Sequence, residues 1–345
     1  MITEDRLVGL DDIHAARERI AGRVHRTPML SSRTAARFVA AGGGSRLADD
    51  RLYVKAEHLQ KTGSFKARGM TNRILTLDDA QRRAGVITVS AGNAAQACAW
   101  AAGAVGVPAT VIMPEGAVRS KLEACRAYGA EVIVLGSHVG EMFAEQERLS
   151  AERGLTFMHP FDDPELIAGH GSAGLEILED LPEVDVVVVA IGGGGLISGI
   201  ATAVKETRPA VRVYGVEPPG ANAMRLALDQ GAPVRFEPRT VADGLAAPFV
   251  GEWTLAAGRR YLDDVVLLDD DAILSGVRFG IERMKQALEP AGAAALAAIL
   301  HGRIPIRDGE RVAVVASGGN LDLARLGEFL ERAAPIPGAA SGASA

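Results

Sequence analysis

Lys66 lies in the stretch KTGSFKARG (61–69), which follows a strand-like run at 52–57 and begins a helix-like run. Ser64 is expected to cap the first turn of that helix, because its hydroxyl oxygen can accept a free amide hydrogen. Lys66 then lies near the positive end of the helix dipole, which disfavours an ammonium and favours a neutral amine. A neutral amine attacks carbonyl carbons to form Schiff bases, so Lys66 is a candidate nucleophile; the alternative is an ordinary solvated lysine.

A run of glycines joins the apolar strand-like stretch at 185–192 to a helix-like stretch. The run consists of Gly192, Gly193, Gly194 and Gly195 and is followed by Leu196. Without side chains in the way, several backbone N–H groups can converge on one anion, which is how a phosphate is held. The pattern therefore predicts a phosphate-binding turn, and the alternative is a turn that only allows close packing of strand and helix.

A nucleotide-dependent enzyme is a rival interpretation of the same turn. Glu217 ends the next strand-like run, close to the spacing at which a dinucleotide-binding fold places an acid on a ribose hydroxyl. The G-x-G-x-x-G spacing fails, however, because Ser198 stands where Gly193 and Gly195 would require the third glycine. The rival therefore remains a minor alternative.

Two further loops follow strand-like runs and carry polar side chains. The first contains Ser90, Ala91, Gly92, Asn93 and Ala94 and enters an alanine-rich helix, whose first amides are a potential carboxylate site. The second begins at Ser317, whose hydroxyl can face a neutral heteroaromatic nitrogen. Plain helix capping is the alternative for both loops.

Apolar runs without strict alternation, separated by helical patterns, predict an α/β fold with mainly parallel sheets covered on both faces. The expected strands are 52–57, 86–90, 109–113, 131–136, 185–192, 211–217, 264–270 and 311–318. Residues 11–22 and 33–43 are expected to be helices, with Asp11 or Asp12 as the cap of the first. Two sheets are expected, one from 86–136 and one after 185, with 52–57 assignable to either. Ligands in such sheets lie beyond the carboxyl ends of the strands.

Composition excludes several other classes of protein. The net charge of −6 without a basic run argues against nucleic-acid binding, and no apolar run is long enough to span a membrane. Cys98 and Cys125 lack the spacing of a metal site, so buried reduced thiols are expected. The acidic N-terminus has no apolar core of a signal peptide, and a cytoplasmic location is therefore predicted.

Together these stretches resemble the fold type II pyridoxal-phosphate enzymes, and within them the threonine/serine dehydratase group that includes serine racemase-like proteins. The similarity covers about residues 25 to 330 and extends to Thr27-Pro28, PFDDPELIAGHGS (160–172), TVADGLAAP (240–248) and EPAGAAALAA (289–298). It implies a two-domain fold like that of the tryptophan synthase beta subunit. The large cofactor-binding domain is expected to comprise 1–60 and 160–333, with 61–84 at the junction, 85–159 as the small domain and 334–345 as a disordered tail.

The resemblance also implies a role for each candidate residue. Lys66 holds pyridoxal 5'-phosphate covalently and removes the α-proton, Phe65 packs near it, and Asn93 bonds the 3'-hydroxyl of the ring. The amides of 192–196 hold the phosphate, Ser317 faces the pyridine nitrogen, and the loop 90–94 receives the substrate carboxylate. The implied activity is dehydration of a β-hydroxy amino acid, such as threonine or serine, to a 2-oxo acid and ammonia. Homodimers or homotetramers are usual in the group.

Several positions depart from the family pattern. Relatives mostly carry histidine at Ala94, which leaves a bulkier substrate open, and racemases carry serine at Ala91, so racemisation is disfavoured. His170 and Ser172 replace a glutamine and a threonine and are interpreted as structural, with His170 a candidate for the border of the pocket. A divalent or monovalent cation near Glu217 is weakly supported, because Ala223 replaces its second acid. A β-replacing synthase and a non-catalytic binding protein remain alternatives.

Overall fold

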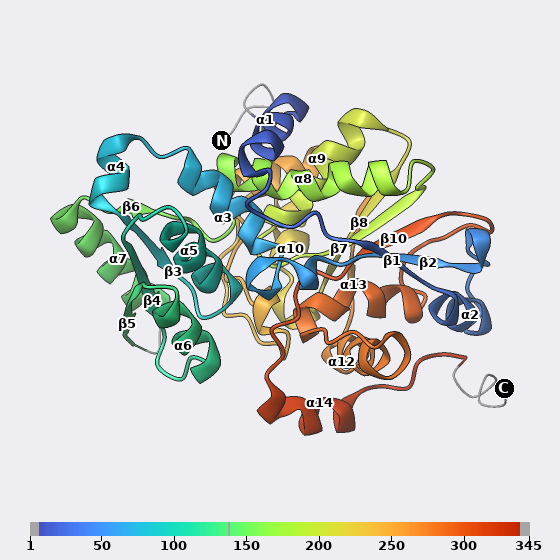
Figure 1. The fold of residues 1–345 in the computed structure, drawn as a ribbon. Helices are drawn as coiled ribbons and strands as arrows, with labels where there is room; N and C mark the ends of the chain where they lie inside the picture. The colour runs from blue at the N-terminus through green and yellow to red at the C-terminus, as the bar shows by residue number, and fades with distance from the viewer. Residues whose placement is uncertain (1–6, 137–138, 339–345) are drawn as a thin grey trace.

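The computed structural model describes residues 7–136 and 139–338, which form two sheets surrounded by helices (Figure 1). The larger sheet has the strand order β1-β2-β10-β7-β8-β9, in which β1 is antiparallel to β2 and the other neighbours are parallel. Its strands are β1 (Met29–Ser32), β2 (Leu52–Lys55), β7 (Val186–Ala190), β8 (Arg212–Glu217), β9 (Asp264–Leu267) and β10 (Val312–Val315).

The smaller sheet has the order β5-β4-β3-β6 and is parallel throughout. Its strands are β3 (Val86–Val89), β4 (Ala109–Met113), β5 (Glu131–Val134) and β6 (Thr156–Phe157). The strand at 52–57, which the sequence left between the two sheets, belongs to the larger one. The sequence analysis missed β1, a half-polar strand at the edge of the larger sheet, and β6, which has only two residues.

Fourteen α-helices in the described residues cover these sheets. They are α1 (Leu10–Ile20), α2 (Arg33–Ala41), α3 (Lys66–Leu75), α4 (Asp79–Ala84), α5 (Asn93–Gly103), α6 (Arg119–Ala127), α7 (Val139–Arg153), α8 (Pro164–Asp180), α9 (Gly195–Thr207), α10 (Ala223–Gln230), α11 (Glu252–Tyr261), α12 (Asp270–Phe279), α13 (Pro290–Leu300) and α14 (Leu326–Arg332). The first helix begins one residue before the expected Asp11, with Gly9 at the cap and the Asp12 carboxylate accepting the Gly9 amide hydrogen.

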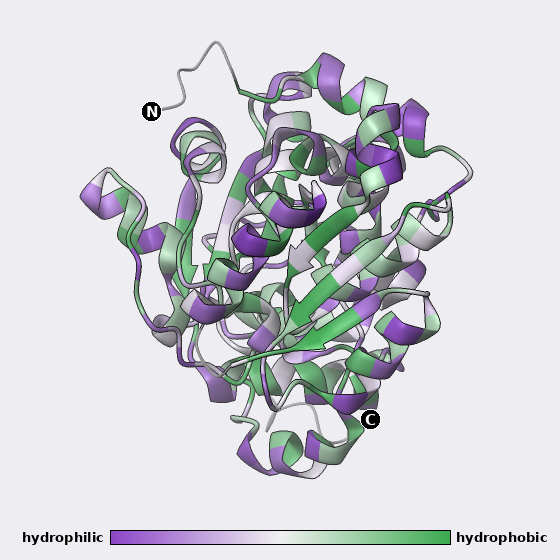
Figure 2. Ribbon diagram, turned by 90° about the vertical axis from the view of Figure 1, so that its left-hand side faces the viewer, coloured by the Kyte–Doolittle hydropathy of each residue, from purple (hydrophilic) through white to green (hydrophobic). Residues whose placement is uncertain are grey.

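The central strands of each sheet are buried on both faces, as the unbroken apolar runs predict, while the edge strands β5 and β9 are partly exposed. In β7 every residue is buried, and alternate side chains contribute to two separate core clusters, one beside α12 and α13 and one beside α8 and α9. In the smaller sheet one face contacts α5 and the other contacts α7. Figure 2 shows the apolar strands inside, with polar residues concentrated on the surrounding helices.

The beginning of α3 is fixed by a buried ionic network around Arg68. This side chain is 1% exposed and donates to the carboxylates of Glu57 and Glu176, at 2.8 and 2.7 Å. Lys55 pairs with the same Glu176 at 2.6 Å. The network joins α3 to β2 and α8, so residue 66, two positions before Arg68, is held rigidly.

The expected disorder of 334–345 does not extend over its first residues. The Ala334 amide donates to the carbonyl oxygen of Asp271 at 2.9 Å, and Ile336 packs against the large core. Residues 339–345 lie outside the described part of the chain. Among the described residues, none of the helices combines the length and apolar character that crossing a bilayer requires.

Candidate active site

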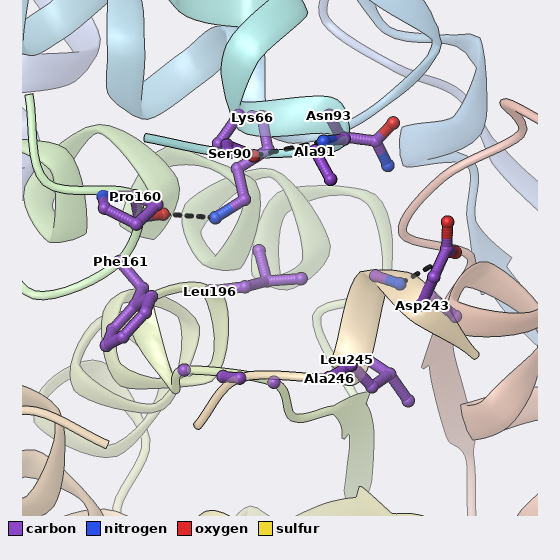
Figure 3. Close-up of a pocket in the computed structure, with 18 of the residues that line it drawn as sticks. Lys66, Ser90, Ala91, Asn93, Pro160, Phe161, Leu196, Asp243, Leu245 and Ala246 are labelled. Atoms are coloured by element: carbon purple, nitrogen blue, oxygen red, sulfur yellow. Dashed lines mark hydrogen bonds between the residues drawn. The ribbon is translucent and has the colours of Figure 1, made fainter. Parts of the chain in front are cut away.

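A cavity of about 370 Å³ lies where the carboxyl ends of strands from both sheets meet. All the sequence-predicted site residues line it: Phe65, Lys66, Ser90, Ala91, Gly92, Asn93, Ala94, Gly192, Gly193, Gly194, Gly195, Leu196 and Ser317. In Figure 3 the loop carrying Ser90, Ala91 and Asn93 lies on one side of the cavity, with Phe161 and Leu196 on another. Segments more than 200 residues apart in the sequence therefore face one space.

Lys66 is the first residue of α3, and its Nζ donates a hydrogen bond to the carbonyl oxygen of Pro160 (Figure 3). Its side chain keeps some exposure toward the cavity, but protein atoms surround the amine. This burial lowers the pKa of Lys66 to about 8, which enlarges the neutral fraction at physiological pH. The shift is in the direction expected from the sequence, with desolvation as its cause, although the ammonium is still the larger fraction at pH 7.

The predicted cap of α3 is wrong. Phe65 is the N-cap residue, and the Ser64 hydroxyl is buried without a hydrogen-bond partner in the described structure. Ser64 adopts an extended conformation because it forms an isolated bridge with Gly318. This bridge places the beginning of α3 beside the loop after β10, so Lys66 and Ser317 reach the same cavity.

The glycine turn after β7 has no room for side chains. A Cβ atom at Gly193 would lie 2.1 Å from Phe161 Cγ, and one at Gly195 would lie 2.6 Å from the Phe161 carbonyl oxygen. Gly194 has φ of 92°, a left-handed conformation that glycine adopts without strain. The turn ends in the first amides of α9, which have no acceptor within the helix. Such a bend is suited to holding a phosphate.

The loop after β3 also ends in free helix amides. Gly92 is the N-cap residue of α5, and its amide donates to Ser90 Oγ at 3.1 Å, which fixes the bend. The N–H groups of Asn93, Ala94 and Ala95 begin the helix and have no intrahelical acceptor. They can receive a carboxylate, as the sequence predicts.

Asn93 belongs to a hydrogen-bonded chain that the sequence analysis did not anticipate. Its Nδ2 donates to Oε1 of Glu289, and its Oδ1 accepts from Asn320 Nδ2 at 2.8 Å. Glu289 is 2% exposed, and its Oε2 has no partner in the described structure. Burial raises the pKa of Glu289 to about 7. Ser317 lies nearby, with its hydroxyl 3.4 Å from the carbonyl oxygen of Ala291.

Two more charged residues line the cavity without having been predicted. Lys121, on α6, pairs with Asp243 at 3.1 Å, and both side chains line the wall next to the loop 90–94. Asp243 and Glu289 lie in stretches that the family resemblance includes, so those motifs were the available signal. Nothing in the local sequence around Lys121 distinguishes it from a surface lysine.

His170, a candidate for the border of the pocket in the sequence analysis, does not line the cavity. It is fully buried, packs edge-to-face on Phe65 with ring centroids 4.8 Å apart, and would collide with a side chain at Gly69. Ser172 is structural, as expected, since its hydroxyl donates to the Gly169 carbonyl oxygen at 2.7 Å. Both residues therefore act behind the cavity wall.

The described residues contain no group of three or more histidine, cysteine, aspartate or glutamate side chains able to hold a metal ion. Glu217, the remaining acid of the family's cation site, accepts the amide hydrogens of Met224 and Arg225 at 2.8 and 3.0 Å. Its carboxylate thus caps α10.

Cys98 and Cys125 are both buried free thiols, as the sequence predicts.

The cavity fits pyridoxal phosphate on three independent observations. It has a half-buried amine with a depressed pKa, an anion cradle that side chains would fill, and a polar wall formed by Ser317 and Asn93 for a heteroaromatic ring. The amine comes from the start of α3 and the cradle from the turn between β7 and α9, and both line the cavity. This is the arrangement needed to bind an aldehyde at one end and a phosphate at the other.

Comparisons with known proteins agree with this fit. Residues 20–318 match the family model described as pyridoxal-phosphate dependent enzyme. The L-threonine ammonia-lyase of Thermotoga maritima is 39% identical over 94% of this chain and 79% of its own. A solved threonine deaminase from T.th. is 42% identical, with a TM-score of 0.81 and coverage of 91% and 99% of the two chains. Maize serine racemase is 37% identical, with a TM-score of 0.86 and coverage of 94% and 97%. The chain therefore belongs to the pyridoxal-phosphate-dependent enzymes of fold type II, and its cofactor is pyridoxal 5'-phosphate.

Proposed function

We propose that this protein is a dehydratase, or ammonia-lyase, that converts a β-hydroxy amino acid such as L-threonine or L-serine to a 2-oxo acid and ammonia. The observation that carries the proposal is the meeting of Lys66, the glycine cradle and the carboxylate loop in one cavity, in a chain about 40% identical to threonine ammonia-lyases. The cavity volume of about 370 Å³ lies in the usual range of small-molecule sites.

Lys66 is assigned two tasks at one atom. Its Nζ would hold the cofactor, and as a free amine the same atom would remove the α-proton of the substrate. The Pro160 carbonyl oxygen, which accepts a hydrogen bond from Nζ, orients the amine inside the cavity. When bound, pyridoxal phosphate supplies an electron sink for bonds broken at the α-carbon.

The other residues orient the substrate and set the electronic state of the site. The free amides at the start of α5 receive the α-carboxylate, and Asn93 is assigned to the 3'-oxygen of the ring. Ser317 is assigned to the ring nitrogen, where a neutral hydroxyl does not enforce protonation. Loss of the α-proton and of the β-hydroxyl as water leaves an enamine, which tautomerises and hydrolyses to the 2-oxo acid and ammonia.

The direct test uses the purified holoenzyme with threonine, serine, 3-hydroxyaspartate and bulkier β-hydroxy amino acids. We expect equal molar yields of ammonia and 2-oxo acid from at least one of them. Lys66→Ala should abolish both products and remove the visible absorbance of the bound cofactor. A protein that stays colourless with added cofactor, or that binds these substrates without releasing ammonia, would overturn the proposal.

Racemisation is the second candidate, favoured by the similarity to maize serine racemase. It needs a proton-carrying group on the face of the α-carbon opposite Lys66, and Ala91 supplies only a methyl group to the cavity. Chiral analysis of recovered serine distinguishes the two reactions, because a pure dehydratase leaves the remaining substrate as the L-form. A β-replacing synthase would instead join an added thiol to the β-carbon, so formation of that product in the presence of a thiol tests this alternative.

We further propose a large domain of 1–60 and 160–333 and a small domain of 85–159, with 61–84 at their junction, a cytoplasmic location and a homodimer or homotetramer. The two buried free thiols, Cys98 and Cys125, suit a reducing compartment. Homodimers or homotetramers are usual in the family that the sequence resembles, which supports the proposed assembly. Light scattering of the purified protein measures the assembly directly, and a monomer at micromolar concentration would contradict it.

A further inference from the structure

Lys121 is a second amine in the active-site cavity, contributed by α6 beside the smaller sheet. Its side chain is 7% exposed, and it lines the cavity next to the loop after β3. A Cβ atom built on Gly92 would lie 3.9 Å from the Nζ atom of Lys121. The ammonium therefore lies beside the start of α5. This is the place where the free amides of the helix face the cavity.

The two acids near Lys121 compensate its charge only in part. The ammonium lies beside the positive end of α5 and is buried, which is unfavourable without an anion. Asp243 supplies one carboxylate oxygen at 3.1 Å, but its side chain is 53% exposed and its charge is therefore screened by solvent. The raised pKa of Glu289, about 7, means that this neighbouring acid is in part protonated near neutral pH.

Lys121 also has hydrogen-bonding capacity to spare. An ammonium carries three N–H donors, and in the described part of the chain its recorded acceptor is Asp243 Oδ2. Two donors thus remain for a ligand. An anion held by the α5 amides would lie against this ammonium.

We propose that Lys121 is a second anchor for the α-carboxylate of the substrate, acting together with the free amides of residues 93–95. This inference rests on the proposed function, because it assigns a specificity residue to the same amino-acid site. Lys121 makes binding depend on the charge of the carboxylate. The enzyme should therefore discriminate against amino-acid amides and esters.

The position of Lys121 favours the α-carboxylate over a distal acidic group of a larger substrate. The ammonium lies against the loop that binds the α-carboxylate. Other parts of the cavity wall are apolar and include Met142, Phe143, Phe161 and Phe249. A side-chain carboxylate directed toward those walls would lose hydration without gaining a cation.

The test measures binding to the holoenzyme by isothermal titration calorimetry, with L-alanine and L-alaninamide as ligands that lack a leaving group. The wild type should bind the acid more tightly than the amide. In Lys121→Met the dissociation constant of L-alanine should rise about tenfold to a hundredfold, while that of L-alaninamide changes less than about threefold. Arg119→Met is the matched control, because Arg119 is on the same helix and its side chain is 90% exposed. Lys121→Arg should keep most of the discrimination.

If Lys121→Met weakened the binding of L-alanine and L-alaninamide equally, the proposal would be overturned. Lys121 would then only form an ion pair with Asp243. A selective loss of 3-hydroxyaspartate turnover, with serine unaffected, would overturn it in favour of a distal-carboxylate anchor. If Lys121→Met does not fold, Lys121→Gln removes the charge while keeping a polar side chain and gives the same comparison. A wild type that binds alanine but releases no ammonia from any substrate refutes the proposed function alone, because the acid-to-amide ratio still tests Lys121.

Discussion

Asn93 donates a hydrogen bond from its Nδ2 to Oε1 of the buried Glu289, and this contact joins the start of α5 to the start of α13. The carboxyl group has one oxygen satisfied by Asn93 and one without a partner in the described structure. Its environment therefore stabilises the protonated form, and desolvation raises the pKa of Glu289 to about 7.

The raised pKa of Glu289 predicts a specific pH dependence of stability. Between its ordinary value of about 4.5 and about 7, the folded protein holds a proton that the unfolded chain releases. The free energy of unfolding must then fall as pH rises through this window, by up to about 1.4 kcal/mol per pH unit from this group. Glu289→Gln should remove that contribution. Urea unfolding of the cofactor-free protein at pH 5, 6 and 7 gives the slope of unfolding free energy against pH for the wild type and for Glu289→Gln. Identical slopes for the two proteins would show that Glu289 ionises normally.

The glycine cradle predicts a steep penalty for one methyl group. Gly193→Ala places a Cβ atom 2.1 Å from Phe161 Cγ, so the turn or the aromatic ring must move. We expect a loss of about 1–3 kcal/mol in stability from overpacking and at least about a tenfold weaker affinity for pyridoxal phosphate. Absorbance titration of the cofactor-free protein measures the affinity.

The matched control for that variant is Gly327→Ala. Gly327 lies in α14, and a Cβ atom there would meet nothing within 4 Å. Alanine should raise stability by up to about 1 kcal/mol, because it is the better helix former. Cofactor affinity should not change. Normal cofactor binding by Gly193→Ala would mean that this turn does not hold the phosphate.

The main parts of the fold and site are predictable because their signals are local. Apolar runs such as Val186–Ala190 mark buried parallel strands, and the glycines that follow mark the places where backbone approaches a ligand. The carboxyl ends of these strands meet in space, so loops that are distant in sequence can be assigned to one site. Ser90, the glycine turn and Ser317 were predicted in this way, whereas Lys66 was predicted from its place at the start of a helix-like run.

The parts that were missed depend on tertiary contacts. Lys121 reaches the cavity only because α6 packs beside the loop after β3, and its neighbouring residues carry no pattern that distinguishes it. The unpaired hydroxyl of Ser64 reflects its bridge to Gly318, a long-range contact that overrides the local capping preference. Likewise the depressed pKa of Lys66 comes from burial, which a sequence does not reveal.

The buried network around Arg68 predicts a large loss of stability when one partner is removed. Arg68→Met leaves the carboxylates of Glu57 and Glu176 without the guanidinium, inside a region that is nearly inaccessible to water. Breaking a buried pair in this way costs about 3–5 kcal/mol. Urea unfolding measures the loss. Arg278→Met is the control, because Arg278 pairs with Glu282 on the surface and is 51% exposed. The urea midpoint of this variant should not shift from that of the wild type. A similar midpoint for both variants would contradict the importance assigned to this network.

The depressed pKa of Lys66 predicts how fast the cofactor-free enzyme recovers its cofactor. Only the neutral amine can attack the aldehyde, and with a pKa of about 8 roughly half of the Lys66 side chains are neutral at pH 8. The rate of reconstitution should therefore rise up to about pH 8 and then level off. Nα-acetyllysine, an unburied amine of ordinary pKa, is the control, and its rate with the same aldehyde should keep rising toward pH 10. Stopped-flow absorbance measures both rates, and the ratio of the two cancels the titration of the cofactor itself. A ratio that stays constant from pH 7 to 10 would mean that burial does not activate this amine, and the covalent role of Lys66 would need another source of reactivity.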